Sequence, residues 1–241
     1  MKSTAPQIGF DRFIDLEWVA MALKIRAGNA SIEELNALLD AAGLSVAAKK
    51  KTRTVLNRLW LEPRPELFSF ANRGVDIFRA NPDISIAALS WGASIATYPF
   101  FGKVADLVGR LTSLQGDCTS AEVHRRMSEV YGEREGTYRM TNMVLQSQAN
   151  WGAIERVDKG KRLIRLPPMR LTNVDLVVWL IEAALRYAGR ALAVPTLQSM
   201  AAIYPFALDQ PLAYVLSTSP NLEVRSEGSN SQFVALREMS F

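Results

Sequence analysis

Two segments of the chain concentrate basic side chains, the residue types that bind phosphate groups. The first runs from Lys49 to Arg58, with Glu62 as the acidic residue near it. Two interpretations stay open: a helix that contacts phosphates, or a solvated helix face without a partner. The candidate phosphate-binding residues are Lys49, Lys50, Lys51, Arg53 and Arg58.

The second segment, residues 119–166, adds amide and hydroxyl side chains to its positive charge. Arginine, asparagine, glutamine and small hydroxyl residues can read base edges in a major groove. Helical spacing favours one face made by residues 134, 138, 141, 142 and 145. The candidates for groove contact are Arg134, Tyr138, Arg139, Thr141, Asn142 and Gln146.

A predicted hairpin follows, in which Lys159, Lys161 and Arg162 can reach phosphates. Such contacts fix position and give salt-dependent affinity without reading sequence. The alternative is that this segment packs against another protein and that its charges are a solvated face.

The residues needed for common catalytic chemistry are sparse. Cys118 is the single cysteine and His124 the single histidine, so an internal disulfide and a Cys/His zinc site are excluded. No phosphate-binding glycine loop of the usual kinds occurs. We expect no catalytic residue, no metal ligand and no cofactor, although a nuclease built from scattered carboxylates stays open.

Composition predicts a globular, cytoplasmic protein without a membrane partner. The chain has 241 residues, 49% of them hydrophobic, with a net charge of +4 and a pI near 9.3. Its most apolar stretch, 174–184, contains Asp175 and Glu182 and is too short to span a bilayer. The amino-terminal residues include acidic side chains where an export signal would need an unbroken apolar run, so we expect no export signal there.

The elements that position the first basic segment are three predicted helices between Asp11 and Leu61. Gly28 should end the first, and Ser31 with Glu34 should form a capping box at the second. Gly43 breaks the chain before the basic helix of residues 46–60. A helix, a short glycine-containing turn and a basic helix are typical of helix-turn-helix units.

Residues 67–114 are the most apolar and aromatic part of the chain. In the core of this stretch, ISIAALSWGASIATYPFFGKVADLVGRLTSLQG, apolar residues appear on all sides of any helix drawn through it, which predicts a buried scaffold interrupted at Tyr98-Pro99. We interpret Trp91, Trp151 and Trp179 as core residues rather than base-stacking platforms. The second basic segment then has two helices, the second over 137–152, and a hairpin around residues 158–161. Helix, turn, helix and hairpin is the winged-helix order.

The remaining chain repeats this order with a different charge. After a helix over 172–192, we expect helices at 195–204 and 210–218 and strands at 222–225 and 232–237. Acidic residues outnumber arginines in this part. The predicted divisions are an N-terminal helix-turn-helix-like unit (1–62), an apolar scaffold (63–118), a winged-helix unit (119–168) and a C-terminal helix with a second winged-helix-like module (169–241).

The order of these segments resembles BrxA, the accessory protein family of BREX phage-defence systems. The resemblance covers roughly residues 10–180 and rests on an amino-terminal apolar helix, KKKTRTVLNRLW, YPFFGKVADLVGRL and TYRMTNMVLQSQANWGAIERV. It implies a small helical DNA-binding protein without known catalysis.

The sequence therefore predicts a mainly α fold: a helical scaffold with helix-turn-helix and winged-helix units and small β-hairpin wings. The predicted partner is nucleic acid, most simply double-stranded DNA, with RNA still open, and the predicted role is an accessory factor in phage defence. Two alternatives stay open: a transcriptional repressor, and a protein-interaction adaptor built on winged helices. Other defence-system proteins would bind through the C-terminal module.

Overall fold

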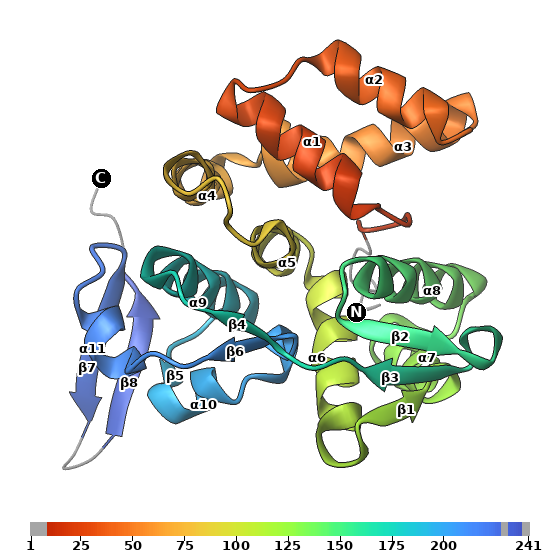
Figure 1. Ribbon diagram of the computed structural model, residues 1–241. Helices are drawn as coiled ribbons and strands as arrows, with labels where there is room; N and C mark the ends of the chain where they lie inside the picture. Colours follow the sequence, from red (N-terminus) through yellow and green to blue (C-terminus); the bar gives the residue numbers. More distant parts are fainter. Residues whose placement is uncertain (1–8, 228–230, 238–241) are drawn as a thin grey trace, which may run out of the picture.

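The computed structural model describes residues 9–227 and 231–237, and it is mainly helical with three small sheets in the described part (Figure 1). The predicted mainly α class is confirmed. In the part of the chain that the structure describes, every helix is too short or too polar to cross a bilayer.

The N-terminal helices are α1 (Leu16–Ala27), α2 (Ile32–Ala41) and α3 (Val46–Leu56). Local capping explains their limits: Gly28 takes a left-handed conformation after α1, and the predicted capping box of Ser31 and Glu34 begins α2. The Ser45 hydroxyl accepts from the Ala48 amide and begins α3. A π-helical turn, η1 (Asn57–Leu61), continues α3 where a regular α-helix was expected.

The predicted scaffold consists of a short 3-10 turn η2 (Pro65–Leu67) and helices α4 (Phe68–Ala80), α5 (Ile86–Thr97) and α6 (Pro99–Gln115). Tyr98 separates α5 from α6 as expected, because proline disfavours helix in the residue before it. Helix α5 is buried on nearly all sides. At Gly92 it touches the Trp179 ring so closely that a Cβ would lie 2.3 Å from it.

The middle unit, defined here as α6 to β3, continues with β1 (Asp117–Thr119), α7 (Ser120–Tyr131) and α8 (Glu135–Asn150). The hairpin follows as β2 (Ile154–Val157), a 3-10 turn η3 (Asp158–Gly160) and β3 (Arg162–Arg165). The three strands are antiparallel in the order β1-β3-β2. The hairpin was predicted, whereas β1 was not.

The C-terminal unit, defined as α9 to β8, contains α9 (Val174–Ala188), β5 (Leu192–Ala193), α10 (Val194–Gln198), α11 (Leu212–Ser217), β7 (Leu222–Glu227) and β8 (Ser231–Leu236). Its antiparallel sheet has the order β5-β8-β7. The predicted helix over 195–204 is wrong, because α10 ends at Gln198 and a separate 3-10 turn, η4 (Ala201–Ile203), follows. The tip of the predicted hairpin, residues 228–230, lies outside the described residues.

A parallel pair of short strands joins the link between the two units to the C-terminal unit. Strand β4 (Met169–Leu171) precedes α9 and pairs in parallel with β6 (Phe206–Leu208), which is inserted between η4 and α11. The hydrophobic core is one continuous cluster that draws on all four predicted divisions of the chain.

The three tryptophans predicted to be core residues are buried: Trp91, Trp151 and Trp179 are 1%, 3% and 2% exposed. Each indole nitrogen donates to a backbone oxygen at 2.8 to 3.0 Å, that of Trp91 to Ala202, that of Trp151 to Ile14 and that of Trp179 to Phe70. Buried indole nitrogens usually find such a partner, so hydrogen bonds as well as packing hold these three rings in position.

The extended segment 9–15 joins the N-terminal helices to the end of α8. The Ile14 amide donates to the Ser147 hydroxyl at 2.8 Å, and the Leu16 amide donates to the Asn150 side chain at 2.7 Å. Phe10 is fully buried, with its ring 5.0 Å from that of Phe101. The segment therefore holds α1 to α3 in a fixed position relative to the middle unit.

Candidate nucleic-acid interface

The exposed basic residues of α3 and η1 are Lys50, Lys51 and Arg58, which form an open basic face. Lys51 lies 3.9 Å from Asp11 of the N-terminal segment, whereas Lys50 and Arg58 make no ion pair among the described residues. The sequence of the helix explains this face, because its buried positions Thr52, Val55 and Leu56 point to the core. The predicted cluster thus presents positive charge to solvent.

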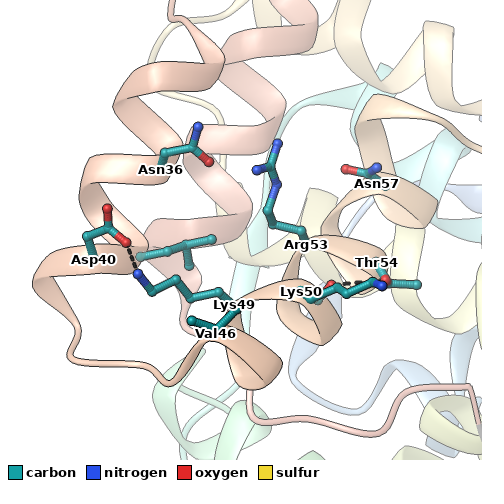
Figure 2. Close-up of a pocket in the computed structure, with 9 residues that line it drawn as sticks. Asn36, Asp40, Val46, Lys49, Lys50, Arg53, Thr54 and Asn57 are labelled. Carbon is teal, nitrogen blue, oxygen red and sulfur yellow. Dashed lines mark hydrogen bonds and ion pairs between the residues drawn. The ribbon is translucent and has the colours of Figure 1, made fainter.

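Lys49, Lys50 and Arg53 line a cavity of about 660 Å³ between α2 and α3, so Lys50 lies at the border between the open face and this cavity (Figure 2). Lys49 pairs with Asp40, so its charge is balanced by a carboxylate. In Figure 2 the Arg53 guanidinium lies between the amides of Asn36 and Asn57, and among the described residues it pairs with no carboxylate. Of the five predicted basic residues, Lys51 and Arg58 therefore lie on the open face, Lys49 and Arg53 in the groove, and Lys50 at the border between the two.

Arg64 is a further exposed arginine, close in sequence to Arg58, that was not among the predicted phosphate-binding residues. Burial raises the pKa of the Tyr98 hydroxyl, and the positive charges of Arg64 and Arg58 act in the opposite direction. Both arginines are thus close to the same buried tyrosine, although six residues separate them in sequence. No pattern in the sequence indicates this proximity.

Helix α8 exposes a different face from the one predicted. Thr141 is fully buried and its hydroxyl donates to the Thr137 carbonyl at 2.8 Å, so it is not available for groove contact. Leu145, on the same predicted face, is also buried. Tyr138 is 61% exposed and Arg139 is exposed, whereas Asn142 and Gln146 are half-buried. The accessible face is therefore formed by Tyr138, Arg139, Asn142 and Gln146, with Arg134 exposed just before the helix.

Asn142 has a partner within the protein. Its side-chain oxygen accepts a hydrogen bond from Arg156 Nη2 of β2 at 2.7 Å. Burial lowers the pKa of Arg156, and the charge of this residue in turn lowers the pKa of His124, together with the larger effect of burial. The His124 ring stacks on Tyr138 at 4.0 Å. Arg156 thus contacts Asn142, and His124 contacts Tyr138, so both residues help to position side chains of α8. The sequence did not indicate this role.

The tip of the hairpin that follows α8 carries two exposed lysines. Lys159 and Lys161 are exposed and make no ion pair in the described part of the chain. Asp158 and Lys159 have φ values of 52° and 57°, and Gly160 follows with a φ of 82°, which gives a tight turn. Arg162, the third predicted hairpin residue, pairs with Asp117 of β1.

Searches against protein-family profiles, curated proteins and solved structures find no match to this chain. The functional argument therefore depends on its own residues and their arrangement.

Proposed function

We propose that the protein binds double-stranded DNA, with α8 in the major groove and phosphates held by the hairpin and α3. The observation that carries the proposal is the arrangement of the middle unit. Its order, helix α6, β1, α7, α8, β2, β3 with β3 central in the sheet, supports the winged-helix interpretation made from the sequence. The exposed face of α8 lies in the same unit as the basic hairpin tip.

The chemistry of the exposed residues fits this assignment. Arg139 and Gln146 carry donor groups suited to base edges, and Asn142 keeps its amide nitrogen available while its oxygen binds Arg156. Lys159 and Lys161 can neutralise phosphates beside the helix. The open face of α3 supplies further positive charge, so we assign it the role of a phosphate anchor without sequence preference.

The salt dependence of DNA binding tests the proposal. If about six phosphates are neutralised, affinity should fall by about 10³ between 50 and 200 mM salt. Lys50→Ala with Lys51→Ala should weaken binding to all sequences alike and lower the salt slope by up to about two units. Lys159→Ala with Lys161→Ala should lower it by a similar amount.

The matched control is Lys24→Ala with Arg170→Ala, which removes two exposed charges outside both clusters and should leave the slope unchanged. RNA duplexes of the same sequence distinguish the two nucleic acids. Absence of binding at low salt, or an affinity insensitive to salt, contradicts the proposal.

A second candidate function is protein binding by the C-terminal unit. Its helix α11, LAYVLS, occupies the place that α8 has in the middle unit, but carries no charged residue and exposes Tyr214 by 71%. Aromatic residues are enriched in protein interfaces and charges are depleted at their centres. This favours an adaptor role for that unit over a second DNA contact.

We also propose, on the resemblance to BrxA, that the protein acts as an accessory factor in phage defence. Gene neighbourhood tests this part separately from DNA binding. Methyltransferase and ATPase genes alongside support defence, whereas a lone gene with a divergent promoter supports a transcriptional repressor.

A further inference from the structure

Two adjoining cavities lie where α6 of the middle unit meets the C-terminal unit. One, of about 320 Å³, is lined by α6, β3 and η4, and the other, of about 510 Å³, by α6, the end of α9 and α10. They share Arg110, Ser199, Met200 and Ala201. The packing that forms their common wall is close, since a Cβ at Gly109 would lie 2.2 Å from the Ala201 oxygen.

The lining is strongly positive. Four cations, Lys103, Arg110, Arg165 and Arg190, face the two cavities against a single carboxylate, Asp106. Asp106 is 8% exposed in its side chain and accepts from Arg110 Nε at 2.9 Å, with Lys103 Nζ at 3.8 Å. Asp106 thus positions Arg110 and Lys103, and three positive charges of the lining remain without a balancing carboxylate.

The donors that this arrangement leaves available point to an anion. Arg110 uses its Nε atom on Asp106, and its two Nη groups have no partner among the described residues. Arg190 is exposed and likewise unpaired there. Arg165 is fixed by a hydrogen bond from Nη2 to the Tyr204 carbonyl at 2.8 Å. Guanidinium forks match the oxygens of phosphate groups, often in pairs of hydrogen bonds.

The larger cavity also has an apolar wall. Tyr187, Leu192 and Met200 line it on the side of the C-terminal unit. The Tyr187 ring lies against Gly102 of α6, where a Cβ would be 2.4 Å away, so its position is defined. Small-ligand sites are typically concave, about 300–1,000 Å³ in volume, and combine apolar walls with a few polar groups.

We propose that this basic cavity pair binds a nucleoside polyphosphate, with the phosphates at Arg110 and Arg190 and the nucleoside against Tyr187, Leu192 and Met200. More than one phosphate is required to balance four cations facing one carboxylate. The site is separate from the residues assigned to DNA binding, so neither proposal depends on the other.

Titration calorimetry with ATP, AMP, adenosine and inorganic phosphate tests the site in the full chain. ATP should bind saturably and at least tenfold more tightly than AMP, and adenosine should show no binding. Arg110→Ala with Arg190→Ala should weaken ATP binding at least tenfold. Arg110→Ala also removes the hydrogen bond to the buried Asp106 carboxylate, so the double variant should have a lower melting temperature. Arg190→Ala alone, which leaves the contact with Asp106 intact, should weaken ATP binding with little change in the melting temperature.

The control is Lys50→Ala with Arg58→Ala, which removes equal charge from the open face of α3. It should weaken DNA binding and leave ATP binding unchanged, while the Arg110 and Arg190 variant should do the reverse. If no probe binds saturably, or if the α3 variant abolishes ATP binding while the Arg110 and Arg190 variant does not, the assignment is wrong. ATP binding without DNA binding would contradict the proposed function alone.

Discussion

The middle unit and the C-terminal unit share an order of elements but differ in the surface they present. With η4 and β6 left aside, each has helix, strand, helix, helix and hairpin, and in each the last strand lies at the centre of the sheet. The middle unit exposes Tyr138, Arg139 and two lysines, whereas the helix in the corresponding place of the C-terminal unit is uncharged. The two units thus share an order of elements, and the binding partner of each must be inferred from its exposed side chains.

The comparison requires that the two units be equivalent in their cores. Trp151→Ala, in the middle unit, and Trp179→Ala, in the C-terminal unit, should each lower the free energy of unfolding by about 3 to 5 kcal/mol. The physical reason is the loss of a large buried ring together with its hydrogen bond to a backbone oxygen. Urea unfolding of the full chain measures both effects.

Trp91→Phe, a smaller change at a third buried tryptophan, should cost less than either alanine substitution. If Trp151→Ala leaves stability unchanged yet abolishes DNA binding, Trp151 is a contact residue and the two cores are not equivalent.

A smaller effect should separate the surfaces. Gln146→Ala should cost about 1 to 3 kcal/mol on a preferred DNA site and leave nonspecific binding nearly intact. Tyr214→Ala, in the corresponding helix of the C-terminal unit, should change neither. The preferred site comes from selection in a random DNA pool, and affinities are measured at one fixed salt concentration.

Asn142→Ala should weaken specific binding as well, but it also leaves Arg156 without its acceptor, so Gln146 is the cleaner substitution. If selection enriches no sequence, α8 does not read bases, and the distinction between the two helices is lost.

The smallest expected effect is a pH dependence confined to the middle unit. His124 is the single histidine of the chain, and burial and the charge of Arg156 lower its pKa. The unfolded chain therefore binds the proton more strongly than the folded chain. The contribution of His124 to the free energy of unfolding should be fully present above pH 6.5, the ordinary pKa of histidine, and decrease as the pH falls below it.

Because a single proton is involved, the free energy of unfolding should change by no more than about 1.4 kcal/mol per pH unit. Thermal unfolding between pH 7.5 and 5 measures it, and His124→Gln should flatten the profile over that range. An unchanged profile in the variant would show that carboxylates, rather than His124, cause the dependence.

Features set by neighbouring residues were predictable from the sequence. The capping box of Ser31 and Glu34, the helix end at Gly28 and the break at Tyr98 each depend on side chains within a few positions. The hairpin around residues 158–161 was predictable for the same reason. The interruption after Gln198 was not, because α10 and η4 are packed against other elements that their own sequence does not specify.

The residues of the candidate sites were harder to predict. The burial of Thr141 results from packing of α8 within the middle unit, which turns the helix relative to the face chosen from spacing alone. Strand β1 has three residues and no alternating pattern long enough to detect. Arg110 and Arg190 are isolated in the sequence, and only the contact between α6 and the C-terminal unit brings them to one cavity pair.

The extended segment 9–15 has a consequence for the order in which the chain folds. Its hydrogen bonds to Ser147, Asn150 and Trp151 join residues 133 to 137 positions apart. Contacts of such sequence separation form late, because a long loop must close before they contribute stability. During synthesis, the docking of this segment onto the end of α8 must therefore wait until Trp151 has emerged.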